Sequence, residues 1–117
     1  MTMFKLPKSG ILRKNKSFQA VYRAGKSYAN RQLVLYVLPT KSGERRVGFA
    51  AGKRLGKAVV RNRVKRLLRE AYRLKQHRLA PGADLILVGR QSIVDERLPA
   101  VVAAFLKVCD RAGLLVR

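Results

Sequence analysis

A basic run between Lys57 and Arg73 contains the side chains of this sequence whose chemistry is easiest to interpret. Seven of its seventeen residues are Lys or Arg, and Glu70 is its only acid. Arginine presents a planar fork of N–H donors that matches two phosphate oxygens, and lysine adds a positive charge on a flexible stem. These residue types predict binding of a polyanion. They do not predict acid–base or nucleophilic catalysis.

The other reactive residue types are too few and too scattered to form a catalytic or metal centre. The six acids stand at positions 44, 70, 84, 95, 96 and 110, whereas a two-metal nuclease needs clustered carboxylates. One histidine, His77, and one cysteine, Cys109, cannot build a zinc site. We expect His77 to be exposed and Cys109 to be in the core. The single cysteine excludes an internal disulfide and fits a reducing compartment.

Positive charge is concentrated in the first two thirds of the chain. The 117 residues carry a net charge of +21, of which residues 1–80 hold +20 and residues 81–117 only +1. So large a positive net charge repels itself in the folded chain, which predicts a negatively charged partner that neutralises it. Nucleic acid is the leading candidate, and an anionic membrane surface is the second. No apolar run approaches the length of a membrane span.

The basic run is predicted to form one amphipathic helix, roughly residues 57–76. Its apolar stripe consists of Val60, Val64, Leu67, Leu68 and Ala71. The opposite face consists of Asn62, Lys65, Arg66, Arg69 and Arg73, with Arg61 and Arg63 at its flanks. A solvated face usually mixes charges of both signs, so this nearly acid-free face favours polyanion binding. A membrane-surface helix is disfavoured, because the domain would bury the apolar stripe that such a helix needs.

Together with the basic helix, the remaining segments predict an α+β fold, a two-layer αβββαβα sandwich that forms a single nucleic-acid-binding domain over residues 1–117. Residues 1–14 form a basic, loosely ordered N-terminal arm. A helix follows over 15–25, capped by Asn15 or Ser17. Strands are expected at 28–38, 45–53 and 84–89, in a mainly antiparallel sheet, and a last helix runs from Leu98 or Pro99 to Gly113. Gly48 and Gly52 suggest a bend or a close backbone approach, which could split the segment 45–53 in two.

Three aromatic residues, Phe18, Tyr22 and Tyr36, are a second candidate site. The first two share a helix face, and the third lies on a strand. Aromatic rings beside basic residues can stack on unpaired bases. Spacing alone favours packing in the core, so both interpretations stay open at this point. Tyr72 and Phe105 are better explained as residues of the core or of its edge.

Three stretches of the sequence resemble one known family. AGKRLGKAVVRNRVKRLLREAYR (51–73) resembles the signature of the bacterial ribonuclease P protein family, with its Arg-Asn-Arg block leading into a basic helix. FQAVYRAGKSYANRQLVLY (18–36) is similar to the family's first helix and long strand, and DLILVGR (84–90) to its last strand. The resemblance covers nearly the whole chain.

The resemblance implies a role in tRNA maturation. The holoenzyme of this family removes the 5′ leader from precursor tRNA, and its catalyst is an RNA subunit that uses magnesium. The implied partners are the catalytic RNA and precursor tRNA in the cytoplasm, with no membrane and no further protein required. The protein would support catalysis at low magnesium. The alternative is a structural RNA-binding protein such as a ribosomal protein, which charge and size fit equally well. The Arg-Asn-Arg block favours the first interpretation.

The resemblance also implies which residues bind which RNA. The catalytic RNA would contact Arg61, Asn62, Arg63, Lys65, Arg66 and Arg69. The single-stranded leader would contact Phe18, Tyr22, Tyr36, Lys53 and Arg54, which reverses the preference for core packing of the aromatic residues. The family fold contains a left-handed βαβ crossover through the basic helix, contrary to the usual right-handed rule. Gly52 stands where relatives often have Ser, which puts a hydroxyl contact there in doubt.

Overall fold

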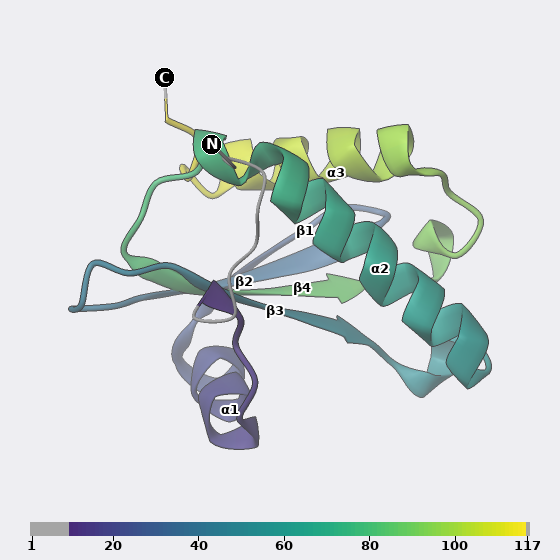
Figure 1. The fold of residues 1–117 in the computed structure, drawn as a ribbon, viewed down its shortest axis with the longest axis horizontal. Helices are drawn as coiled ribbons and strands as arrows, with labels where there is room; N and C mark the ends of the chain where they lie inside the picture. Colours follow the sequence, from purple (N-terminus) through teal and green to yellow (C-terminus); the bar gives the residue numbers. More distant parts are fainter. Residues whose placement is uncertain (1–9, 117) are drawn as a thin grey trace.

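A four-stranded sheet separates the helices of the protein into two groups (Figure 1). The structure is a computed structural model that describes residues 10–116. Its helices are α1 (Asn15–Ala24), α2 (Ala58–Lys75) and α3 (Leu98–Arg111). Its strands are β1 (Lys26–Ala29), β2 (Leu33–Pro39), β3 (Arg46–Ala51) and β4 (Ala83–Gly89). The α+β class and the element order αβββαβα are confirmed. Because α1 covers one face of the sheet and α2 and α3 the other, there are three layers instead of the expected two.

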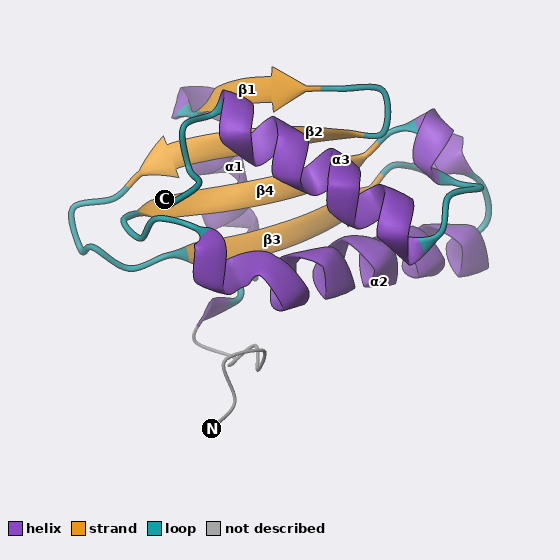
Figure 2. Cartoon of the chain, turned by 90° about the horizontal axis from the view of Figure 1, so that it is seen from above, coloured by secondary structure: helices purple, strands orange, loops and turns teal. Residues whose placement is uncertain are grey.

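The sheet has the order β1-β2-β4-β3 and is mainly antiparallel, as predicted. Strand β2 runs antiparallel to both of its neighbours, whereas β3 and β4 are parallel and connected through α2. In Figure 1 the arrows of β3 and β4 both point to the right, and Figure 2, seen from the side of α2, places β4 above β3. A right-handed crossover would place β4 below β3. The β3–α2–β4 crossover is therefore left-handed.

The segment predicted as one strand over 28–38 is two strands joined by a tight turn. The side chain of Asn30 makes this turn, because its Oδ1 accepts hydrogen bonds from the backbone N–H groups of Gln32 (3.1 Å) and Leu33 (3.0 Å). Asparagine commonly turns a chain in this way. The expected split of the segment 45–53 is wrong, since β3 is continuous through Gly48.

Two apolar clusters hold the layers together. The larger one packs the inward side chains of β2, β3 and β4 against α2 and α3, around the buried rings of Phe105 and Tyr72. The smaller cluster joins α1 to the other face through Leu12, Val21 and Ile86. Strand β4 contributes to both clusters, so it is buried on both faces of the sheet.

The N-terminal segment differs from its prediction where the structure describes it. Residues 1–9 of the predicted loose arm lie outside the described residues. Ile11 forms a β-bridge with Val47, and the Leu12 N–H donates to the Val47 carbonyl at 2.7 Å. Leu12 is buried, so residues 11 and 12 are part of the folded domain at the β3 edge. The expected caps of α1 are wrong, because the N-cap is Lys14 and no side chain caps the helix.

Candidate nucleic-acid interface

The outer face of α2 presents cations to solvent, as the helical pattern predicts. Its inner face buries Val64, Leu68, Ala71 and Tyr72 against the sheet. On the opposite face Lys65, Arg66 and Arg69 are exposed, and their side chains make no hydrogen bond or ion pair with any residue between 10 and 116. Asn62 is exposed on the same face. This row of unpaired donors is suited to binding phosphates.

Other arginines of the basic run bind groups of the protein itself. The Arg61 Nε donates to the Gly56 carbonyl at 3.2 Å, which leaves its two terminal nitrogens for another partner. Arg63 donates to the carbonyls of Val94 (2.6 Å) and Glu96 (2.9 Å). Arg73 forms a bidentate pair with Glu70, and this hydrogen bonding lowers the pKa of the Glu70 carboxyl. The basic run therefore contains both free cations and cations that have structural partners.

Arg45 is also a structural cation, located between β3 and the end of α2. Its guanidinium donates to the Tyr72 hydroxyl (2.8 Å) and to the carbonyls of Leu79 (2.8 Å) and Gln76 (3.0 Å). A cation at the C-terminal end of a helix is favoured by the helix dipole, and Arg45 also binds carbonyls of the turn that follows α2. Part of the large positive charge thus stabilises the fold.

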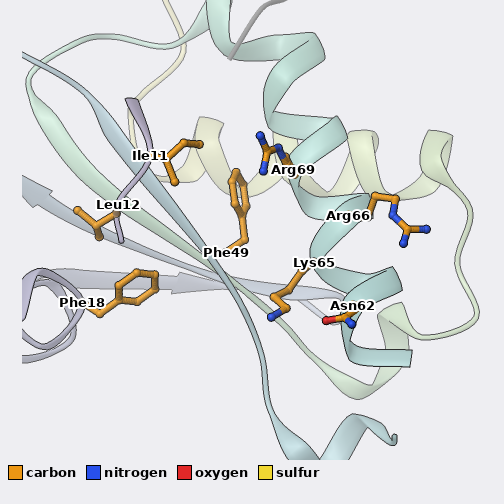
Figure 3. Close-up of a pocket in the computed structure, with 8 residues that line it drawn as sticks. All are labelled: Ile11, Leu12, Phe18, Phe49, Asn62, Lys65, Arg66 and Arg69. Carbon is orange, nitrogen blue, oxygen red and sulfur yellow. The ribbon is translucent and has the colours of Figure 1, made fainter. Parts of the chain in front are cut away.

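A pocket of about 390 Å³ joins the cationic face to an apolar surface (Figure 3). It is lined by Ile11, Leu12, Phe18, Phe49, Asn62, Lys65, Arg66 and Arg69. In Figure 3 the residues of the N-terminal segment and α1 lie on one side, those of α2 lie on the other, and the Phe49 ring stands between them. The Phe18 ring is close to the backbone of β3, because a Cβ on Gly48 would lie only 2.4 Å from it. The close approach expected at a strand glycine therefore occurs at Gly48.

The three predicted aromatic residues do come together on the α1 face of the sheet. The rings of Tyr22 and Tyr36 meet edge to face at 4.9 Å, and the Phe18 and Tyr22 centroids are 6.2 Å apart. Phe18 and Tyr36 pack against the smaller apolar cluster, whereas Tyr22 is 41% exposed. Burial, followed by the proximity of Tyr36, raises the pKa of Tyr22, so the phenol is neutral. The cluster both packs in the core and presents a ring to solvent.

Lys53 and Arg54 lie in the short helical turn Lys53–Leu55 that directly follows β3. Both are exposed, and neither side chain pairs with a residue of the described part of the chain. They do not line the pocket. Beside them, a Cβ on Gly52 would meet no atom within 4 Å. Room for a serine side chain is therefore present, and the close approach expected at this glycine is absent.

Comparison with known proteins identifies the family. The Ribonuclease P family model matches residues 6–113. The ribonuclease P protein components of Symbiobacterium thermophilum and of Clostridium perfringens strain SM101 are 45% and 47% identical over 113 and 110 residues. These alignments cover 96% of this chain and 98% of the first relative, and 88% of this chain and 88% of the second. The Staphylococcus aureus RNase P protein superposes with a TM-score of 0.83 at 32% identity, covering 93% of this chain and all of that one. The Thermotoga maritima RNase P protein superposes with a TM-score of 0.78 at 25% identity, covering 86% of this chain and 94% of that one.

The chain belongs to the ribonuclease P protein family. Its fold matches that of the solved ribonuclease P proteins over most of its length. Family membership implies an RNA subunit as partner and tRNA processing by a ribonucleoprotein as the setting.

Three residues that line the pocket of this ribonuclease P protein were not among the predicted site residues. Ile11 and Leu12 belong to a segment that the sequence suggested was loosely ordered, although an apolar pair within a basic arm was an available signal. Phe49 packs against the larger apolar cluster. However, β3 lies at the edge of the sheet, so the Phe49 ring remains half-buried. The contact of Ile11, Leu12 and Phe49 with the α2 side of the pocket follows from the folded arrangement, in which the N-terminal segment pairs with β3.

The described residues of this ribonuclease P protein do not fit a protein-held magnesium ion. No group of three or more His, Cys, Asp or Glu residues between positions 10 and 116 could hold a metal. His77 is exposed and Cys109 is buried, both as predicted. Burial raises the pKa of the Cys109 thiol to about 12. Within the same range, none of the helices is long and apolar enough to cross a membrane.

Proposed function

We propose that this ribonuclease P protein binds the catalytic RNA with the outer face of α2 and the single-stranded 5′ leader of precursor tRNA with its aromatic cluster. The observation that carries the proposal is the pocket, which joins unpaired cations of α2 to an apolar wall. Cations suit RNA backbones, and exposed aromatic rings suit unpaired bases. A domain that offered only phosphate contacts would need no such combination.

The pocket supports a contact with an unpaired nucleotide. Its volume of about 390 Å³ falls within the range of roughly 300–1,000 Å³ typical of ligand pockets. A base of the leader can pack on the Phe18 and Phe49 side of the pocket, while Lys65 or Arg69 on the α2 side meets a phosphate of the catalytic RNA. Lys53 and Arg54, on the segment between β3 and α2, would bind backbone phosphates of the leader. The exposed Tyr22 would provide the stacking surface.

The proposal divides the work between the RNA and the protein. Cleavage is assigned to the RNA subunit with its magnesium ions, and the protein, which has no group of three or more His, Cys, Asp or Glu residues suited to a metal between positions 10 and 116, is assigned to binding. The protein binds and orients the two RNAs and neutralises part of their phosphate charge. Fixed cations placed beside RNA phosphates replace part of the counterion atmosphere that magnesium would otherwise provide. The protein therefore lowers the magnesium concentration needed for endonucleolytic removal of the leader in the cytoplasm.

The test is precursor-tRNA cleavage by the cognate catalytic RNA across a magnesium titration. Added protein should shift the titration to lower magnesium, and the combined variant Lys65→Ala, Arg66→Ala and Arg69→Ala should abolish most of the shift. Lys107→Ala, at an exposed cation on α3, is the matched control and should behave like the unmodified protein. Absence of any shift on adding protein would refute the proposal. Sequencing the RNA that co-purifies with the protein separates this function from that of a ribosomal protein.

A further inference from the structure

Arg63 is oriented differently from the other cations at the centre of the basic run. Its Nη1 and Nη2 donate to two different backbone carbonyls, those of Val94 at 2.6 Å and Glu96 at 2.9 Å. Both terminal nitrogens of the guanidinium are thus bonded to the protein. Arg66, three residues along the helix, is exposed and pairs with no described residue. Two arginines of the same helix therefore have different environments.

The carbonyls that Arg63 binds belong to the segment between β4 and α3. This segment is in turn tied to the β1–β2 turn, since the Gln32 Nε2 donates to the Glu96 carboxylate (3.3 Å) and the Arg90 N–H donates to the Gln32 carbonyl (2.9 Å). The turn is held on α3 by Asn30, whose Nδ2 donates to the Ala104 carbonyl at 2.9 Å. Arg63 therefore joins α2 to a polar network at this end of the sheet.

We propose that Arg63 is a positioning residue, which holds the first turns of α2 in place for RNA binding and does not itself contact RNA phosphate. The inference rests on the proposed function of the α2 face. Lysine cannot replace arginine here, because a single ammonium on a flexible stem cannot reproduce a rigid fork aimed at two carbonyls. The role thus depends on the shape of the guanidinium and not on its charge alone.

Positioning and phosphate contact predict different dependences on salt. A plot of log K against log salt has a negative slope. Losing one phosphate contact makes this slope shallower by about 0.7 to 0.9. Losing a positioning residue leaves the number of phosphate contacts unchanged, but α2 must then be ordered at the moment of binding. The affinity should fall by a constant factor at every salt concentration.

The experiment measures the affinity of the catalytic RNA for the full chain over a range of potassium chloride concentrations, at a temperature where each variant is fully folded. Arg63→Ala and Arg63→Lys should both bind roughly threefold to tenfold more weakly, with the slope of the unmodified protein. Arg66→Ala is the matched control, and its plot of log K against log salt should have a shallower slope. In the free Arg63→Ala protein, amide exchange at Ile93, Val94 and Glu96 should accelerate, because their hydrogen bonds lie within the released segment.

Two results would overturn the inference. One is a salt slope that becomes shallower by about one unit in Arg63→Ala and returns to the value of the unmodified protein in Arg63→Lys. That result would indicate a direct phosphate contact. The other is unchanged affinity in both Arg63 variants. A slope that stays constant in Arg66→Ala would be a different failure, since it would refute RNA binding by the α2 face and this inference with it.

Discussion

Arginine serves two purposes in this protein, and the partner of each guanidinium shows which. Arg66 lies on the outer face of α2 without a partner among the described residues, whereas Arg45 donates to one hydroxyl and to the carbonyls at the end of α2. Sequence alone treats both as members of a basic surface. Contacts with residues more than 25 positions away separate them, because those contacts form only once the chain has folded.

Replacing these two arginines should affect two different quantities. Arg45→Ala should lower the free energy of unfolding by roughly 2–3 kcal/mol, because it leaves several partly buried acceptors without a donor. Arg66→Ala should change that free energy by less than about 0.5 kcal/mol but reduce the salt slope of RNA binding by about one unit. Urea denaturation and salt-dependent binding measure the two effects. The assignment of Arg45 would be wrong if its variant were as stable as the unmodified protein.

Tyr36 tests the leader contact at the same scale. Its ring packs edge to face on the exposed Tyr22, so its removal should disturb stacking on unpaired bases. Tyr36→Ala should weaken holoenzyme binding of precursor tRNA by roughly 1–3 kcal/mol and leave the affinity for mature tRNA almost unchanged. Tyr36→Phe keeps the ring and is the control. Equal losses for both tRNAs would argue against a leader site at the aromatic cluster.

Among the elements, α2 was the easiest to predict and the β1–β2 turn the hardest. The apolar stripe of α2 repeats over about three turns, from Val60 to Ala71, and each end of the helix lies one residue from the expected bounds of 57–76. The turn lies in a run rich in Leu, Val and Tyr that suits one long strand. Asn30 interrupts it by binding two nearby N–H groups and the Ala104 carbonyl, which is 74 residues away. A local pattern contains no information about that distant partner.

The two roles of the Asn30 side chain can be separated by substitution. Asn30→Ala removes both the acceptor that makes the turn and the donor to α3, and should cost roughly 1–3 kcal/mol of unfolding free energy. Asn30→Asp keeps the acceptor and removes only the donor, so its cost should be smaller. Chemical denaturation compares the variants. If Asn30→Asp proved as destabilising as Asn30→Ala, the bond to α3 would account for the whole effect.

For the whole molecule, topology and charge differ in how far the sequence predicts them. The concentration of charge in residues 1–80 can be counted directly. The left-handed β3–α2–β4 crossover came from the family resemblance, because right-handed connections are the rule and no residue pattern marks the exception. The pocket also could not be predicted, since it requires the N-terminal segment, α1, β3 and α2 to meet.

The net charge of +21 makes the stability of the free protein depend on anions. Sulfate or phosphate that binds the clustered cations of the folded chain stabilises it by mass action, by about 1.4 kcal/mol when the free anion is tenfold above its dissociation constant. Low millimolar sulfate should therefore raise the melting temperature by several degrees, while sodium chloride at equal ionic strength should raise it less. Identical melting curves in the two salts would mean that only general screening is at work.

Site-directed cross-linking can test the assignment of two RNAs to two surfaces. A cysteine introduced at another position can be labelled selectively, because Cys109 is buried and its thiol pKa is raised to about 12. Val59 is 73% exposed on α2, two turns before Arg66, and Gln19 is exposed on α1 beside Phe18. Neither residue is assigned to RNA binding, so Val59→Cys and Gln19→Cys should leave both surfaces functional.

The decisive measurement is to place an aryl azide on each of these cysteines and to map the cross-links in the holoenzyme bound to precursor tRNA. The account predicts that position 59 cross-links to the catalytic RNA whether or not the leader is present. Position 19 should cross-link to leader nucleotides and give no such product with mature tRNA. Cross-links from both positions to the same RNA, or from position 19 to the catalytic RNA alone, would contradict the account.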